Sequence, residues 1–210
     1  MRVIGIMGPL GAGKSTVAKL LVEKHEVHRM RMAGPLKQML KDLLLRRGVS
    51  VTDVERMIEG DMKQDPSPMF SGQSPRWAMQ SLGTEWARKC ISPNFWVECI
   101  IDQIEAIEKL NPNVVIVIDD IRFPNEVKMI EDLGGEIWRV TGRSLEKAPS
   151  IWKRLLSIFT FGIYNPIHPS ERGWRKVDPD VDIDNSFSQE LLEFQVEEAF
   201  NPNAHLGELK

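Results

Sequence analysis

Three glycines, a lysine and a serine stand close together near the start of the chain. Residues 8–15 read Gly-Pro-Leu-Gly-Ala-Gly-Lys-Ser, which has the spacing G-x-x-x-x-G-K-[ST]. In such a loop, backbone N–H groups and a helix N-terminus surround phosphate oxygens, the lysine reaches the β- and γ-phosphates, and the hydroxyl ligates Mg²⁺. The pattern predicts a nucleoside triphosphate site with catalytic Lys14 and the metal ligand Ser15, made by Gly8, Gly11, Ala12, Gly13, Lys14, Ser15 and Thr16.

Two carboxylates, Asp119 and Asp120, close an apolar run that begins at Asn113. A carboxylate at the end of a buried strand can hold Mg²⁺ or its water shell, which complements Ser15. Side chains alternate along an extended chain, so we expect only one of the two acids to face the phosphates. Capping of the next helix is the alternative role for either residue.

Arginines form the second signal, because transfer of a phosphoryl group between two phosphate-bearing molecules requires neutralisation of both. The guanidinium group binds phosphate in a bidentate manner. We expect some of the following arginines at the ligand edge of a sheet and the others at the surface: Arg76, Arg88, Arg122, Arg143, Arg154, Arg172 and Arg175.

One predicted helix carries a row of polar side chains. Gln80, Thr84 and Arg88 are spaced four residues apart and share a helix face, which offers partners to a base edge and a phosphate. The alternative is the solvent face of an amphipathic helix. Among nearby aromatic residues we expect Trp86 and Phe95 in the core, and Trp96 either in the core or stacked on a base.

The elements that must position these residues alternate between strand and helix. The glycine-rich loop lies between an apolar strand at 3–6 and a helix from Thr16, and residues 60–75 read as an exposed loop. Further strands are expected at 27–32, 113–120, 137–140 and 181–183, and further helices at 36–45, 76–90, 95–110, 124–133, 151–159 and 188–200. This order predicts an α/β, doubly wound, mainly parallel five-stranded sheet with helices on both faces and ligands at the carboxyl ends of the strands.

Composition limits the classes of protein. The length of 210 residues suggests one domain with an insertion. The net charge of −3 and the pI of about 5.9 argue against direct nucleic-acid binding. Cys90 and Cys99 have no partner motif, so we expect buried, reduced thiols in a cytoplasmic protein. No leader precedes the first strand and no apolar run approaches the roughly 20 residues that span a bilayer, so no membrane partner is expected.

Several segments, in order along the chain, resemble the phage deoxynucleoside monophosphate kinases, which are P-loop enzymes related in architecture to adenylate kinase. They cover residues 5 to about 192, and they are GPLGAGKST, MAGPLK from Met32, QSLGTEWAR from Gln80, FWV from Phe95, DIRFPNE from Asp120, HPSE from His168 and IDN from Ile183. The resemblance implies a P-loop kinase fold over 1–210, an acceptor-binding helical region at about 33–110 and a lid-like insertion at about 143–179.

The resemblance also implies an activity, the Mg²⁺-dependent transfer of the γ-phosphate of ATP to a deoxynucleoside 5′-monophosphate, in the host cytoplasm for a phage-encoded enzyme. It favours Asp120 over Asp119 as the metal-side acid. The implied catalytic residues are Lys14, Asp120, Arg122, Arg143 and Arg172; those near the acceptor are Lys37, Gln80, Glu85, Arg88 and Arg122; and those of the lid are Arg143, His168, Glu171 and Arg172. The polar row and the nearby aromatic residues add Thr84 and Trp96 as substrate-binding candidates.

The apolar stretch 151–161 departs from this pattern, and it leaves the shape of the lid and the oligomeric state open, a homodimer among the options. A P-loop kinase of another small molecule, such as dephospho-coenzyme A, is an alternative; its hydroxyl acceptor would require a base such as Asp120 or Glu85. A GTP-dependent switch is a third option, against which the absence of an Asn-Lys-x-Asp sequence counts.

Overall fold

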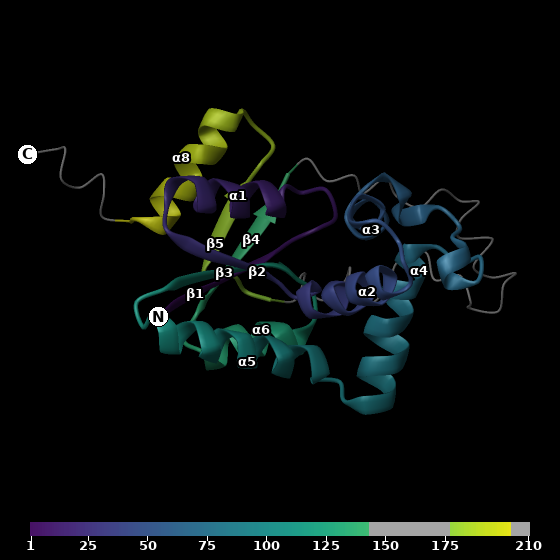
Figure 1. Ribbon diagram of the computed structural model, residues 1–210. Helices are drawn as coiled ribbons and strands as arrows, with labels where there is room; N and C mark the ends of the chain where they lie inside the picture. The colour runs from purple at the N-terminus through teal and green to yellow at the C-terminus, as the bar shows by residue number, and fades with distance from the viewer. Residues whose placement is uncertain (143–176, 203–210) are drawn as a thin grey trace, which may run out of the picture. The chain divides into compact units, whose positions relative to one another are not determined.

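The structure is a computed structural model, and it describes residues 1–142 and 177–202 (Figure 1). The predicted helix at 151–159 and most of the predicted lid, 143–176, lie outside the described residues. The strands are β1 (Arg2–Met7), β2 (Val27–Arg31), β3 (Val115–Ile121), β4 (Glu136–Thr141) and β5 (Val181–Asp184). The helices are α1 (Lys14–Lys24), α2 (Gly34–Arg46), α3 (Val51–Ile58), α4 (Pro75–Gln80), η3 (Ser81–Ile91), α5 (Phe95–Leu110), α6 (Pro124–Asp132) and α8 (Gln189–Phe200).

The five strands form one sheet in the order β2-β3-β1-β4-β5. Strand β1 lies in the middle and pairs in parallel with β3 and with β4, and β4 pairs in parallel with β5. The predicted α/β class and five-stranded sheet are therefore confirmed. Because the strands run in parallel, the residues that follow β1, β3, β4 and β5 meet at one edge of the sheet.

Side chains of β1 point alternately to the two faces of the sheet, and both faces are covered by helices. Ile4 and Ile6 are fully buried in a cluster with side chains of α1 and α8. Gly5 points to the opposite face, where a Cβ atom would lie 2.9 Å from the Ile130 side chain of α6. Helices α1 and α8 accordingly lie on one side of the sheet and α6 on the other (Figure 1).

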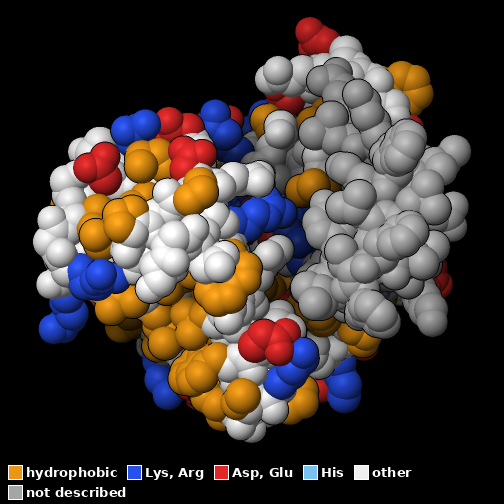
Figure 2. Space-filling model, turned by 90° about the vertical axis from the view of Figure 1, so that its right-hand side faces the viewer, with side chains coloured by type: hydrophobic (Ala, Val, Ile, Leu, Met, Phe, Trp, Pro, Cys, Tyr) orange, Lys and Arg blue, Asp and Glu red, His pale blue; other side chains and the backbone are white. Residues whose placement is uncertain are grey.

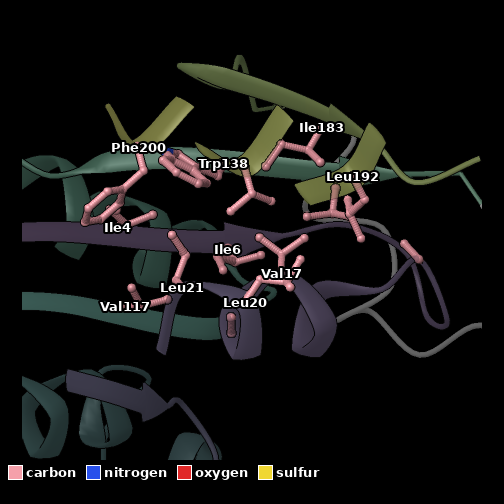
Figure 3. Packing of buried hydrophobic residues seen from close by; sticks show 14 residues of the cluster. Ile4, Ile6, Val17, Leu20, Leu21, Val117, Trp138, Ile183, Leu192 and Phe200 are labelled. Atoms are coloured by element: carbon pink, nitrogen blue, oxygen red, sulfur yellow. The ribbon is translucent and has the colours of Figure 1, made fainter. Parts of the chain in front are cut away.

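The core next to the glycine-rich loop is made of large apolar side chains from distant parts of the chain. Trp138 of β4 is fully buried in one cluster with Phe200 of α8 and Ile183 of β5. Val17 and Leu21 join this cluster from α1 (Figure 3). Burial of each such side chain contributes about 1.5–3 kcal/mol. This cluster joins the helix that starts at Lys14 to the strands that end at the sheet edge.

The chain divides into two compact units. Unit 1 comprises Met1–Met30 and Glu108–Lys210, and unit 2 comprises Arg31–Ile107. Unit 2 is helical and has its own apolar cluster, to which α2, α3, α4 and the start of α5 contribute. The face drawn in Figure 2 carries hydrophobic side chains among charged side chains of both signs.

Several expectations for unit 2 need correction. Helix α3 was not predicted, and residues 60–75 contain two short 3-10 turns, Asp61–Gln64 and Pro68–Phe70. The predicted helix at 76–90 is an α-helix only to Gln80, after which η3 has π-helical hydrogen bonding.

Two side chains of this segment are exposed instead of buried. Trp86 is 40% exposed and contacts the Phe95 ring edge-on, and the Cys90 thiol is also exposed. The reason is that i→i+5 bonding changes which residues share a helix face.

Candidate phosphate-binding site

Glycine is required in the loop after β1 by backbone geometry and by close contacts. Gly8, Gly11 and Gly13 have φ values of +141°, +79° and +102°. Such positive values are readily adopted only by glycine. A Cβ atom at Gly8 would also lie 2.1 Å from the Val140 carbonyl oxygen of β4. The loop is thus packed directly on the neighbouring strand.

Lys14 lies within the curve of this loop, as the first residue of α1. Its side chain is only 10% exposed, and Nζ donates to the carbonyl oxygens of Gly8 at 2.8 Å and Pro9 at 2.9 Å. Nζ also lies 3.9 Å from Oδ1 of Asp120. Ser15 and Thr16 follow in the first turn and are exposed. The ammonium group, the exposed hydroxyl of Ser15 and the helix N-terminus are the parts that a phosphate chain requires.

Asp120 stands on a bulge at the end of β3. Ile6 pairs with Asp119 and Met7 pairs with Ile121, so Asp120 is an extra residue in the ladder. Its φ is +72°, a conformation in which Asp and Asn are enriched among residues other than glycine. A bulge re-aims a side chain, and here the carboxylate lies beside Lys14.

Asp119 has a different environment, in the interior. Its side chain is 2% exposed and forms an ion pair with Arg29 of β2, 90 residues away in the sequence. The two neighbouring acids have different surroundings, and the cause is the bulge at Asp120 and not the simple alternation of an extended chain. Arg29 was not among the predicted site residues, because only the pairing of β2 with β3 brings it to Asp119.

The turn after β3 holds Arg122 against Asp120. Nε and Nη2 of Arg122 each donate to the Asp120 carboxylate at 2.8 Å. The Glu126 side chain is buried and accepts hydrogen bonds from the backbone N–H groups of Arg122 at 2.7 Å and Phe123 at 3.1 Å. Glu126 was not predicted as a site residue. Its position four residues after Arg122 is the feature of the sequence that could have pointed to it.

A buried amide reaches the loop from the last strand of the sheet. Asn185 directly follows β5 and is 8% exposed. Its Nδ2 atom donates to the Ala12 carbonyl oxygen at 2.9 Å. Asn185 belongs to one of the segments that carry the family resemblance, but it was not predicted as a site residue.

The predicted acceptor residues other than Arg122 lie in unit 2. Lys37 Nζ donates to Glu59 Oε2 at 2.7 Å, and Nη1 of Arg31 lies 3.4 Å from the same oxygen. Burial acts to raise the pKa of Glu59, but the hydrogen bond and charge of Lys37, with the charges of Arg31 and Lys41, hold it below its usual value. Lys37 and Arg31 therefore share the Glu59 carboxylate.

The polar row on α4 and η3 is partly open to solvent. Gln80 is exposed, Thr84 is half-buried, and half-buried Arg88 donates to the Pro93 carbonyl oxygen at 3.5 Å. Glu85 is exposed and pairs with Lys89 at 2.7 Å. This arrangement leaves the row accessible to a ligand.

Trp96 does not offer a ring face for stacking. It is 3% exposed within the apolar cluster of unit 2, and its Nε1 donates to the Gly83 carbonyl oxygen at 3.0 Å. The structure therefore places Trp96 in the core, which corrects its assignment as a substrate-binding residue.

The predicted lid residues Arg143, His168, Glu171 and Arg172 lie outside the described residues, as do Arg154 and Arg175. Among the residues that are described, no group of three or more His, Cys, Asp or Glu side chains could hold a metal ion. Mg²⁺ commonly takes one or two protein oxygens and completes its shell with water and phosphate. Ser15 and the partly exposed Asp120 supply donors of that kind.

No helix in the described part of the chain is long and apolar enough to cross a bilayer.

Comparisons with known proteins give one sequence relative and several structural ones. No family model matches the chain. Over 147 residues, 67% of this chain and 74% of the relative, it is 29% identical to a protein of Acanthamoeba polyphaga mimivirus named "Putative deoxynucleotide monophosphate kinase". Among solved structures, dephospho-CoA kinase from Campylobacter jejuni is 13% identical, with 100% of both chains covered and a TM-score of 0.48. Shikimate kinase from Aquifex aeolicus is 15% identical, with 96% and 98% covered and a TM-score of 0.45.

Proposed function

We propose that this protein transfers the γ-phosphate of ATP to a deoxynucleoside 5′-monophosphate, with Mg²⁺, and gives the diphosphate for DNA precursor synthesis. The observation that carries the proposal is the loop of Gly8–Ser15, in which Lys14 is enclosed and lies 3.9 Å from the re-aimed carboxylate of Asp120. The acceptor class is supported by the resemblance of the sequence and by the name of the mimivirus relative.

The loop residues would hold the donor phosphates. Backbone N–H groups of the loop and of the first turn of α1 face the phosphate oxygens, and the Lys14 ammonium leaves the carbonyl oxygens of Gly8 and Pro9 to meet the β- and γ-phosphates. Ser15 and Asp120 would hold Mg²⁺, directly or through its water, and the Arg122 guanidinium would turn from Asp120 towards phosphate. The bound ion neutralises charge on the β- and γ-phosphate oxygens.

The chemical step needs few protein groups. An oxygen of the acceptor phosphate attacks the γ-phosphorus in line, a new P–O bond forms, and the bond to the bridging oxygen of ADP breaks. No general base is required, because the attacking oxygen is already anionic. The residues therefore act by alignment and by neutralisation of charge that develops in the transition state.

The test is release of ADP from ATP and Mg²⁺ with a panel of acceptors. We expect turnover with one or more deoxynucleoside monophosphates and little without an acceptor. A hydroxyl acceptor such as dephospho-coenzyme A, used in place of the monophosphates, would instead indicate a kinase of another small molecule. Slow hydrolysis of GTP that no acceptor stimulates would indicate a switch protein.

Lys14→Ala is the matched control for this assay. Loss of one donor to a developing charge costs about 2.7–4 kcal/mol, so kcat should fall about 10²–10³-fold while the fold persists. Near wild-type turnover by Lys14→Ala at saturating ATP would contradict the assignment of the loop.

A further inference from the structure

We propose that Asn185 is a positioning residue that orients the peptide between Ala12 and Gly13, so that the N–H of Gly13 faces the nucleotide phosphates. The inference rests on the proposed nucleotide site and extends it to a residue 173 positions away in the sequence. Asn185 acts through the loop and does not itself contact the substrate.

The first step is the geometry of the peptide unit. In a trans peptide the carbonyl oxygen and the following N–H point in opposite directions within one plane. The Asn185 amide holds the Ala12 carbonyl oxygen at 2.9 Å, on the side of the loop that faces β5 and α8. The N–H of Gly13 must therefore point away from Asn185. Gly13 is the N-cap of α1, where N–H groups bind anions.

The second step is a close contact that the same side-chain nitrogen makes with the next residue. A Cβ atom at Gly13 would lie 2.2 Å from Nδ2 of Asn185. Position 13 therefore excludes a side chain for two reasons, its φ of +102° and the space that Asn185 occupies. The Asn185 amide therefore packs directly against the loop at Gly13.

The third step concerns the rigidity of the support. The backbone N–H of Asn185 donates to the Thr141 carbonyl oxygen of β4 at 3.0 Å. The preceding residue, Asp184, exchanges two hydrogen bonds with the Gln195 side chain of α8, at 2.9 and 3.0 Å. The Asn185 amide thus lies on a turn that follows β5 and is hydrogen-bonded to β4 and α8. Such a fixed position is the preorganisation that electrostatic binding of an anion requires.

The experiment compares Asn185→Ala and Asn185→Leu with Asn201→Ala, a control at the opposite end of α8 whose side chain bonds only Glu197 in the described structure. Both Asn185 variants remove the donor without adding a charge next to the phosphates. The measurements are ADP affinity in the presence of Mg²⁺ by calorimetry, the urea midpoint without nucleotide, and steady-state kinetics.

We expect each Asn185 variant to bind ADP about tenfold more weakly than the control, as for the loss of one hydrogen bond. The KM for ATP should rise by a similar factor with little change in kcat, and the urea midpoint should fall as well, because the buried Ala12 carbonyl oxygen loses its donor. A purely structural role would lower the urea midpoint and leave ADP affinity per folded molecule unchanged.

Wild-type ADP affinity in Asn185→Ala would overturn the inference; this smaller variant cannot overpack, so it decides the matter where Asn185→Leu does not fold. The proposed function fails separately, if wild-type protein binds ADP but phosphorylates no monophosphate. Failure of wild-type protein to bind ADP would overturn both.

Discussion

Asp119 and Asp120 are neighbours of the same residue type, but the backbone directs their side chains to different partners. Asp119 is buried against Arg29, whereas Asp120 is a third exposed and lies between Arg122 and Lys14. The difference arises from one extra residue in the ladder, because without the bulge Asp120 would continue the strand and pair with Met7. The bulge therefore decides which of the two carboxylates lies beside Lys14.

The two acids should respond differently to the same substitution. Asp119→Asn should lower the free energy of unfolding by about 3 kcal/mol, since breaking a buried ion pair leaves Arg29 without its counter-charge. Asp120→Asn should leave stability nearly unchanged, because Asn also tolerates φ of +72°. Instead it should raise the Mg²⁺ concentration for half-maximal turnover about tenfold or more.

Urea denaturation and a Mg²⁺ titration of kcat on both variants separate these effects. A larger Mg²⁺ defect in Asp119→Asn than in Asp120→Asn would mean that the wrong carboxylate has been assigned to the metal.

At the scale of elements, β1 is joined to β4 and α8 by Arg2. Its guanidinium contacts the Glu136 carboxylate at 2.8 and 3.1 Å, and Nη1 donates to the Phe200 carbonyl oxygen at 2.8 Å. Burial acts to raise the pKa of Glu136, but hydrogen bonds from Arg2 and Trp138 and the charge of Arg2 outweigh it, so the pKa lies below its usual value of 4.5.

This shift predicts a pH dependence of stability. Because the folded-state pKa is depressed, the contribution of Glu136 is fully present above pH 4.5, the unfolded value, and is lost as the pH falls through the lower folded value. Glu136→Gln should therefore be less stable than wild type at neutral pH, and the difference should shrink below pH 4.5. Urea midpoints from pH 7 to pH 3 would show it; a difference that is constant with pH would contradict the role of the carboxylate charge.

Helix η3 is irregular, and π-helical segments frequently occur at functional sites. If Arg88 binds the acceptor phosphate, Arg88→Ala should lose a charged hydrogen bond worth about 1.5–3 kcal/mol, or about ten- to hundredfold in kcat/KM for the acceptor. ATP affinity should change little.

Kinetics at varied deoxynucleotide and saturating ATP test this prediction, with Arg46→Ala, an exposed arginine at the end of α2, as the control. Acceptor kinetics of Arg88→Ala that equal those of Arg46→Ala would place Arg88 outside the site.

At the scale of the whole molecule, unit 1 is built from two stretches of chain that are separated by unit 2. Residues of the candidate phosphate site come from the ends of β1, β3 and β5, so the site can form only when both stretches are folded together. A ligand that binds this site must therefore stabilise the folded chain.

We expect ADP with Mg²⁺, at a hundred times its Kd, to stabilise the protein by about 2.7 kcal/mol. For a chain of this size that corresponds to a rise in Tm of about 5–10 °C. Lys14→Ala should show a smaller rise at the same ADP concentration. A wild-type Tm that does not change with ADP up to millimolar concentration would contradict nucleotide binding.

Much of the architecture follows from signals within a few residues of one another. The spacing from Gly8 to Ser15 predicts the loop, the β-branched run before Asp119 predicts a buried strand, and helix 95–110 is confirmed to the residue. These patterns can be recognised in the sequence because helical hydrogen bonding, backbone freedom and hydrophobic periodicity are local properties. They suffice for the order of strands and helices and hence for the α/β class.

Tertiary structure alone decided which side chains meet. Arg29 and Asp119 are 90 residues apart, and Asn185 and Ala12 are 173 apart, so neither pair has a local signature. Exposure of Trp86 and burial of Trp96 likewise depend on packing in unit 2, where Trp96 belongs to the apolar cluster. Contacts between distant residues depend on strand order, register and packing, which arise from the free energy of the whole fold and not from any single segment.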